Sequence, residues 1–164
     1  MKNGFTLIEV LLVIAITAIL STLVLAFNYG LKIREDLNLA VNSLAAVVRD
    51  SQQKSITQEE MKKWGVYLQV KNNQSTYSLF RDNTSNILAI YTLPDSLKFD
   101  TSSGWSNLPP GVCPNDCYRE FYFTQVDGLP YPLVDSSVII KLQIDNDTNS
   151  ARSIIVSNNG TVSY

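Results

Sequence analysis

The sequence predicts an α+β protein in which one long N-terminal helix packs against an antiparallel β-sheet head. From residue 5 to residue 27, every residue is apolar or small and polar except Glu9. Apolar residues then recur at steps of three and four up to about residue 55, which is typical of an amphipathic helix. The rest of the chain consists of short β-rich runs separated by turns, which favours an antiparallel sheet.

Composition limits the function classes that fit. The chain has 164 residues, a formal net charge of −2 and a sequence pI near 5.0, so its bulk charge does not indicate a nucleic-acid-binding domain. It has no histidine, which removes the commonest general base and transition-metal ligand. It also has no spacing of Ser, Asp and Lys that suggests a catalytic nucleophile, and no glycine-rich phosphate-binding loop. We therefore expect no catalysis, no cofactor and no metal ion.

The apolar run is long enough for a membrane anchor. A helix of about 23 residues spans ~34 Å, which exceeds the hydrocarbon core. An ordinary signal peptide fits poorly, because residues 1–4 are a very short n-region and no small-residue cleavage site follows Ala26. A charged side chain at this depth is costly, so Glu9 is a candidate functional residue. As a plain single-pass anchor, the segment would place Glu9 near the interface.

The stretch Gly4-Phe5-Thr6-Leu7-Ile8-Glu9-Val10-Leu11-Leu12 resembles the N-terminus of type IV pilins and of type II secretion pseudopilins. The resemblance implies that a prepilin peptidase cuts between Gly4 and Phe5 and removes the leader, residues 1–4. It also implies N-methylation of the new Phe5 amine. Residues 5–29 would then serve as a transmembrane helix and later as the core of a filament.

The same resemblance gives Thr6 and Glu9 a role in assembly and register. Glu9 would face the Phe5 amine of a neighbouring subunit. The physics agrees, because a buried charge without a partner costs several kcal/mol, whereas a paired charge can fix the register of parallel helices. The sequence departs from many family members in having no proline between residues 21 and 29.

Residues 30–56 are predicted to form an amphipathic continuation of the same helix, packing on the head. The apolar stripe comprises Ile33, Leu37, Ala40, Val41, Leu44, Val47 and Val48. Polar and charged residues fill the opposite face, so we interpret the stripe as core packing.

Residues 57–164 are predicted to form a globular β-rich head. A capping box at 57–60 should open a short helical turn. Strands are expected at 64–70, 76–81, 87–93, 97–99, 120–124, 137–144, 152–157 and 161–164, and a long surface loop at 100–117. The end of the chain resembles the GspH/FimT-like minor pseudopilins, in which a Phe-x-x-x-Gly turn precedes the last strands. Residues 123–128 and 154–162 carry that likeness.

Two smaller features have structural explanations. Cys113 and Cys117 have a C-x3-C spacing without histidine, so a disulfide-closed loop in an exported domain is favoured over zinc. Residues 145–149 begin like a calcium loop, but Ser150 and Val156 replace the required glycine and glutamate. A polar turn between two strands is therefore expected there.

The sequence thus predicts a non-enzymatic structural subunit, a minor one, of a type IV pilus or a type II secretion pseudopilus. It would be a single-pass inner-membrane protein with its N-terminus in the cytoplasm before it enters the filament. Its expected partners are other pilin or pseudopilin subunits, the prepilin peptidase, the inner-membrane assembly platform and membrane lipid. One alternative is a tip pilin that captures DNA, for which the C-terminal region offers Arg152 and Lys141 against Asp145 and Asp147. The other is an unrelated single-pass membrane protein with an extracytoplasmic head.

Overall fold

The computed structural model describes residues 6–102, 116–132, 137–145 and 147–164, without the side chains of residues 23–29 and 148. The chain divides into two compact units, Met1–Glu35 and Asp36–Tyr164. Each unit is described by itself.

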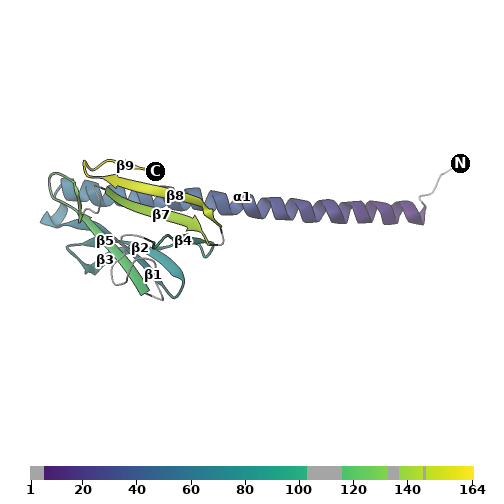
Figure 1. Cartoon of the computed structure of the whole chain (residues 1–164), viewed down its shortest axis with the longest axis horizontal. Coiled ribbons are helices and arrows are strands. Elements are labelled where there is room, and N and C mark those ends of the chain that lie inside the picture. Colours follow the sequence, from purple (N-terminus) through teal and green to yellow (C-terminus); the bar gives the residue numbers. More distant parts are fainter. Residues whose placement is uncertain (1–5, 103–115, 133–136, 146) are drawn as a thin grey trace. The chain divides into compact units, whose positions relative to one another are not determined.

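One helix, α1 (Leu7–Ile56), accounts for the first third of the chain. It continues through Gly30, as the sequence predicts, and ends at the expected residue 56 (Figure 1). Its second half carries the predicted stripe, because the six stripe residues that belong to the second unit are all buried: Leu37, Ala40, Val41, Leu44, Val47 and Val48. Side chains on the polar face, such as Asn42 and Arg49, are exposed.

The head contains two antiparallel sheets, whereas the sequence predicts a single sheet. The order of strands is β3-β2-β1-β5-β6 in one sheet and β4-β7-β8-β9 in the other. The strands are β1 (Trp64–Lys71), β2 (Gln74–Arg81), β3 (Asn83–Thr92), β4 (Leu97–Phe99), β5 (Asp116–Phe123), β6 (Pro130–Tyr131), β7 (Ser137–Ile144), β8 (Asp147–Ser157) and β9 (Val162–Ser163). The alternation of apolar residues specifies one buried face for each strand, but it does not say whether neighbouring hairpins join one sheet or two.

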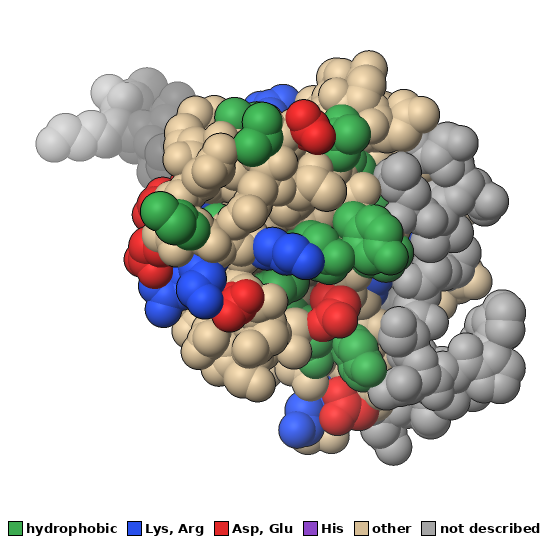
Figure 2. Space-filling model, turned by 90° about the vertical axis from the view of Figure 1, so that its left-hand side faces the viewer, with side chains coloured by type: hydrophobic (Ala, Val, Ile, Leu, Met, Phe, Trp, Pro, Cys, Tyr) green, Lys and Arg blue, Asp and Glu red, His purple; other side chains and the backbone are tan. Residues whose placement is uncertain are grey.

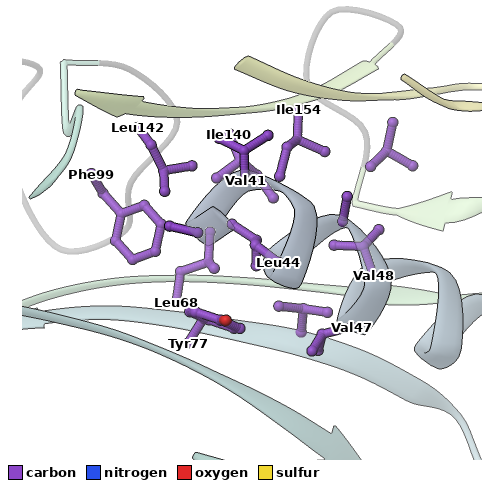
Figure 3. Close-up of a cluster of buried hydrophobic side chains, with 14 of the residues drawn as sticks. Val41, Leu44, Val47, Val48, Leu68, Tyr77, Phe99, Ile140, Leu142 and Ile154 are labelled. Atoms are coloured by element: carbon purple, nitrogen blue, oxygen red, sulfur yellow. The ribbon is translucent and has the colours of Figure 1, made fainter. Parts of the chain in front are cut away.

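Both sheets bury their apolar faces around the same stretch of helix (Figure 3). Ile140, Leu142 and Ile154 reach it from β7 and β8, while Leu68 and Tyr77 reach it from β1 and β2. The Tyr77 hydroxyl lies 2.9 Å from the Ser43 hydroxyl on α1, so this buried polar group is hydrogen-bonded. Burial raises the pKa of Tyr77, and the bond with Ser43 opposes that rise.

Several predicted boundaries are wrong. The capping box at residues 57–60 does not form, because the Thr57 hydroxyl donates back to the Gln53 carbonyl and so closes α1. The next element is a three-residue 3-10 turn, η1 (Glu59–Met61), preceded by Gln58 in a left-handed conformation without a side-chain cap.

The strands β3, β5 and β8 begin four or five residues earlier than predicted, and β6 was not predicted. β3 and β8 begin with polar residues, and such residues are typical of turns, so the sequence alone placed them outside the strands. As the edge of its sheet, β3 needs no buried face along its length, and most of its side chains are exposed.

The turns that precede the last strands are tied to the end of α1. Gln52 donates from Nε2 to the carbonyls of Gly128, at 2.9 Å, and Gly160, at 2.8 Å. Both glycines have positive φ, +64° and +81°, which a side chain would strain. One helix residue thus holds together two turns that lie far apart in the sequence.

The head is sensitive to a side chain at Gly65 on β1. A Cβ there would lie 2.4 Å from the Phe121 carbonyl oxygen and 2.6 Å from the Phe80 ring. We expect Gly65→Ala to lower the free energy of unfolding of the head by about 2–3 kcal/mol, because backbone as well as ring must shift. Chemical denaturation of the full chain in detergent, followed by near-UV circular dichroism, measures this.

Gly30→Ala is the matched control, since nothing lies within 4 Å of a Cβ at that position. It should leave the helix as stable or up to about 1 kcal/mol more stable. A Gly65→Ala protein as stable as the wild type would contradict the packing described for β1, β2 and β5.

Candidate functional site

The first half of α1 presents apolar side chains on all sides. Every described side chain from residue 6 to residue 22 is exposed in the isolated chain. The large apolar ones are Leu7, Ile8, Val10, Leu11, Leu12, Val13, Ile14, Ile16, Ile19 and Leu20. A helix that is apolar all round is normally covered by lipid or by other protein. Within the described residues, no helical stretch meets the length and apolarity expected of a membrane span.

The hydroxyl groups of this segment are satisfied within the helix. Thr17 donates to the Val13 carbonyl at 2.9 Å, and Ser21 donates to the Thr17 carbonyl at 2.7 Å. Thr22 donates to the Ile19 carbonyl at 2.8 Å. These bonds let hydroxyl groups sit in apolar surroundings without an outside partner.

Glu9 differs from these residues. Its carboxylate has no hydrogen bond or ion pair within the described part of the chain. Because the described hydroxyls between residues 7 and 22 are bonded internally, Glu9 is the polar side chain of this stretch that still needs a partner.

Glu9 also lies in the first turn of α1, close to Thr6. The Thr6 carbonyl accepts the backbone N–H groups of Glu9, at 3.1 Å, and Val10, at 3.3 Å, so Thr6 is the residue that opens the helix. Thr-x-x-Glu has the spacing of a capping box, but no side-chain capping bond of Thr6 or Glu9 forms among the described residues. A carboxylate in a first turn is nevertheless favoured by the helix dipole. This effect of the dipole on Glu9 was not predicted, although the place of Glu9 near the start of the helix is visible in the sequence.

The other predicted site residues are described in part. Gly4, Phe5 and Cys113 lie outside the described residues, so the cleavage, methylation and pairing predictions stay predictions. Cys117 is 1% exposed and is disulfide-bonded.

Residues 147–149 of the polar turn predicted at 145–149 belong to β8 instead. Asp147 accepts from the Asn149 N–H at 3.1 Å and from the Ser150 hydroxyl at 2.6 Å, while Asp145 pairs with Lys98 at 2.6 Å. Among the described residues, no group of three His, Cys, Asp or Glu side chains could hold a metal ion.

The basic residues considered for DNA capture do not form a patch. Lys141 pairs with Asp100 at 2.9 Å, and Arg152 is exposed on β8. Burial raises the pKa of Asp100, but hydrogen bonds from Ser102 and Lys141 outweigh that effect, so the net shift is downward. On the face shown in Figure 2, Lys and Arg side chains lie among Asp and Glu side chains. Such a surface gives little attraction for a polyanion.

The N-terminal segment matches a known family model. Residues 1–25 match the prokaryotic N-terminal methylation motif, and this stretch includes Glu9 and the exposed apolar residues around it. The chain carries a prokaryotic N-terminal methylation motif. The predicted resemblance to pilins is thereby confirmed for this segment, while the GspH/FimT-like subgroup stays a prediction.

The methylation motif is followed by an α+β head, as predicted. No curated protein matches the chain. Among solved structures, the type IV minor pilin FimU of Pseudomonas aeruginosa is similar, with 14% sequence identity and a TM-score of 0.49 over 77% of this chain and 90% of that one.

Proposed function

We propose that this protein is a structural subunit of a type IV pilus or of a type II secretion pseudopilus. Prepilin peptidase removes residues 1–4 by cutting after Gly4, and the new Phe5 amine is methylated. The observation that carries the proposal is a methylation motif on an apolar helix whose Glu9 lacks a partner.

The proposed partner of Glu9 is the amine of Phe5 on a neighbouring subunit. In a bundle of parallel helices with a small axial stagger, the amine of one subunit can come beside the carboxylate of the next. Between apolar helices the effective dielectric is low, so the attraction is strong and either charge alone is costly. Thr6 contributes by opening the helix immediately before Glu9, which fixes where the carboxylate stands.

The remaining partners follow from the same scheme. Before assembly, residues 5–29 hold the chain in the inner membrane with the N-terminus in the cytoplasm and the head outside. The exposed apolar surface of α1 contacts lipid in this state and other pilin or pseudopilin helices after the assembly platform adds the subunit.

We further propose that the subunit is a minor component. The sequence predicts a long surface loop before β5, which includes Cys113, and such a loop suits a contact made by few subunits. A disulfide between Cys113 and Cys117 would shape that loop, and a pairing of this kind suits a domain exported from the reducing cytosol.

The first test reads the mature N-terminus. Mass spectrometry of the protein isolated from its own host should show a chain that begins with N-methylated Phe5. A chain that retains Met1 would contradict the proposal and favour an unrelated membrane protein. A chain that begins with unmethylated Phe5 would support the proposed cleavage and contradict the proposed methylation.

The second test separates the two roles of Glu9. Glu9→Gln keeps a side chain that suits the capping position but removes the charge, whereas Glu9→Ala removes both. Both variants should lower incorporation into filaments at least about tenfold, because breaking a buried pair costs about 3–5 kcal/mol. Quantitative immunoblotting of sheared filaments against the membrane pool measures this.

Glu35→Gln is the control, since Glu35 is an exposed carboxylate on the same helix. It should assemble like the wild type. If Glu9→Gln also assembled like the wild type while Glu9→Ala did not, the carboxylate would be a helix-capping residue and the proposed pair would be wrong.

A further inference from the structure

The turn between β8 and β9 contains an Asn-Gly pair, Asn159-Gly160. In such a pair the backbone nitrogen of the glycine can attack the side-chain amide carbon of the asparagine, because the glycine has no side chain to hinder the approach. A C–N bond forms, ammonia leaves, and a five-membered succinimide results. Water then opens the ring and gives aspartate or isoaspartate. The net change replaces an NH2 group by OH and needs neither an oxidant nor a reductant.

The fold requires glycine at position 160. Gly160 has a φ of +81°, and a Cβ there would lie 2.7 Å from Nε2 of Gln52 and 3.2 Å from the Gly128 carbonyl oxygen. A larger residue would strain the backbone and collide with these neighbours. The reactive pair is therefore a consequence of how closely this turn packs on α1.

Both reacting groups are held in hydrogen bonds. The Gly160 N–H donates to the Ser157 carbonyl at 2.9 Å. The Asn159 Oδ1 accepts the backbone N–H of Thr161 at 3.0 Å. The attack needs the Gly160 nitrogen to lose its proton and the amide carbon to move over it, so both bonds must break first. Asn159 is exposed to water, and the geometry of the turn is what prevents the reaction.

Helix α1 holds this turn in place. Gln52 donates from Nε2 to the Gly160 carbonyl at 2.8 Å, and this bond is partly buried. Arg49 donates from Nη2 to the Val162 carbonyl at 3.2 Å, and its guanidinium lies 5.1 Å from the centre of the Tyr164 ring. The Arg49 bond is exposed, so water competes with it more than with the Gln52 bond. Gln52 is therefore the main side chain that opposes opening of the turn.

We propose that Asn159 is a deamidation site that the fold protects, and that this protection depends on Gln52. Deamidation then occurs when the turn opens locally, without unfolding of the head. Local openings of this kind need less free energy than global unfolding. The site does not depend on the proposed function, because its chemistry and its contacts belong to one chain.

Conversion to isoaspartate would break the contact that protects the site. Isoaspartate carries the main chain through the former side chain, which adds one CH2 group between residues 159 and 160 and leaves a new carboxylate. The Gly160 carbonyl then cannot remain on Gln52 while Val162 keeps its place opposite Val156. We expect β9 to come away from α1 after the conversion.

The test follows deamidation of the full chain in detergent by mass spectrometry at mildly alkaline pH. Trypsin cleaves after Arg152, so residues 153–164 form the C-terminal peptide, and its fragmentation distinguishes Asn159 from Asn158. The folded wild type should deamidate at Asn159 at least about tenfold more slowly than the chain unfolded in urea. Equal rates in the folded and the unfolded chain would overturn the proposal.

Gln52→Ala tests the residue on which the protection depends. Because this variant loses the hydrogen bond to Gly160, deamidation of Asn159 should be about tenfold faster than in the wild type. Gln53→Ala is the matched control, since Gln53 is the next residue of the same helix and is exposed. It should leave the rate unchanged. A Gln52→Ala protein that deamidates as slowly as the wild type would contradict the role of Gln52.

Gly65→Ala separates local opening from a general loss of stability. Gly65 contacts Phe80 and Phe121 rather than the turn. While this variant remains folded, Asn159 should deamidate in it as slowly as in the wild type. Equal acceleration in Gly65→Ala and Gln52→Ala would show that the reaction needs global unfolding, and would overturn the proposal.

Amide hydrogen exchange of the wild type gives a readout that needs no variant to fold. The amides of Gly160 and Thr161 should exchange faster than those of the core strand β7, because the turn opens without the head. Exchange of all these amides at the rate of global unfolding would contradict a local opening.

Discussion

Apolar helix surface must be covered, and the described residues of this chain cover only part of α1. In the second half of the helix, the stripe from Leu37 to Val48 is buried by two sheets. In the first half, apolar side chains surround the helix and remain exposed in the isolated chain. The head therefore has its own hydrophobic core, whereas the first half of α1 needs lipid or other protein around it. The proposed function follows from that difference.

The polar side chains in the exposed first half of α1 differ in whether they need a partner from outside the helix. Thr17, Ser21 and Thr22 bond to carbonyls of their own helix and so need nothing from outside. Glu9 has no such solution, and its position in the first turn puts it beside the new terminus that cleavage after Gly4 would create. The helix dipole favours this carboxylate, and the proposed amine of a neighbouring subunit would act on it in the same direction.

The sequence predicts the helices and most strands because these depend on local periodicity. The apolar stripe on α1 and the alternation of apolar residues on β7 are each visible within one short stretch of sequence. The division into two sheets, the bonds from Gln52 to Gly128 and Gly160, and the burial of Arg119 depend on residues about twenty to more than a hundred positions apart. Arg119 lies on the same face of β5 as Phe121 and Phe123, but the predicted strand began only at residue 120 and left Arg119 outside it. At the candidate site, the motif is recognised from the sequence by resemblance. Only the structure shows that the hydroxyl groups of the same helix are hydrogen-bonded and that Glu9 is not.

A structure of the assembled filament, determined by cryo-electron microscopy, tests the central claim most directly. The account predicts that the Glu9 carboxylate lies within about 4 Å of the Phe5 nitrogen of an adjacent subunit, the distance of an ion pair. A filament in which Glu9 bonds only within its own helix, with the nearest Phe5 nitrogen more than about 10 Å away, would contradict it.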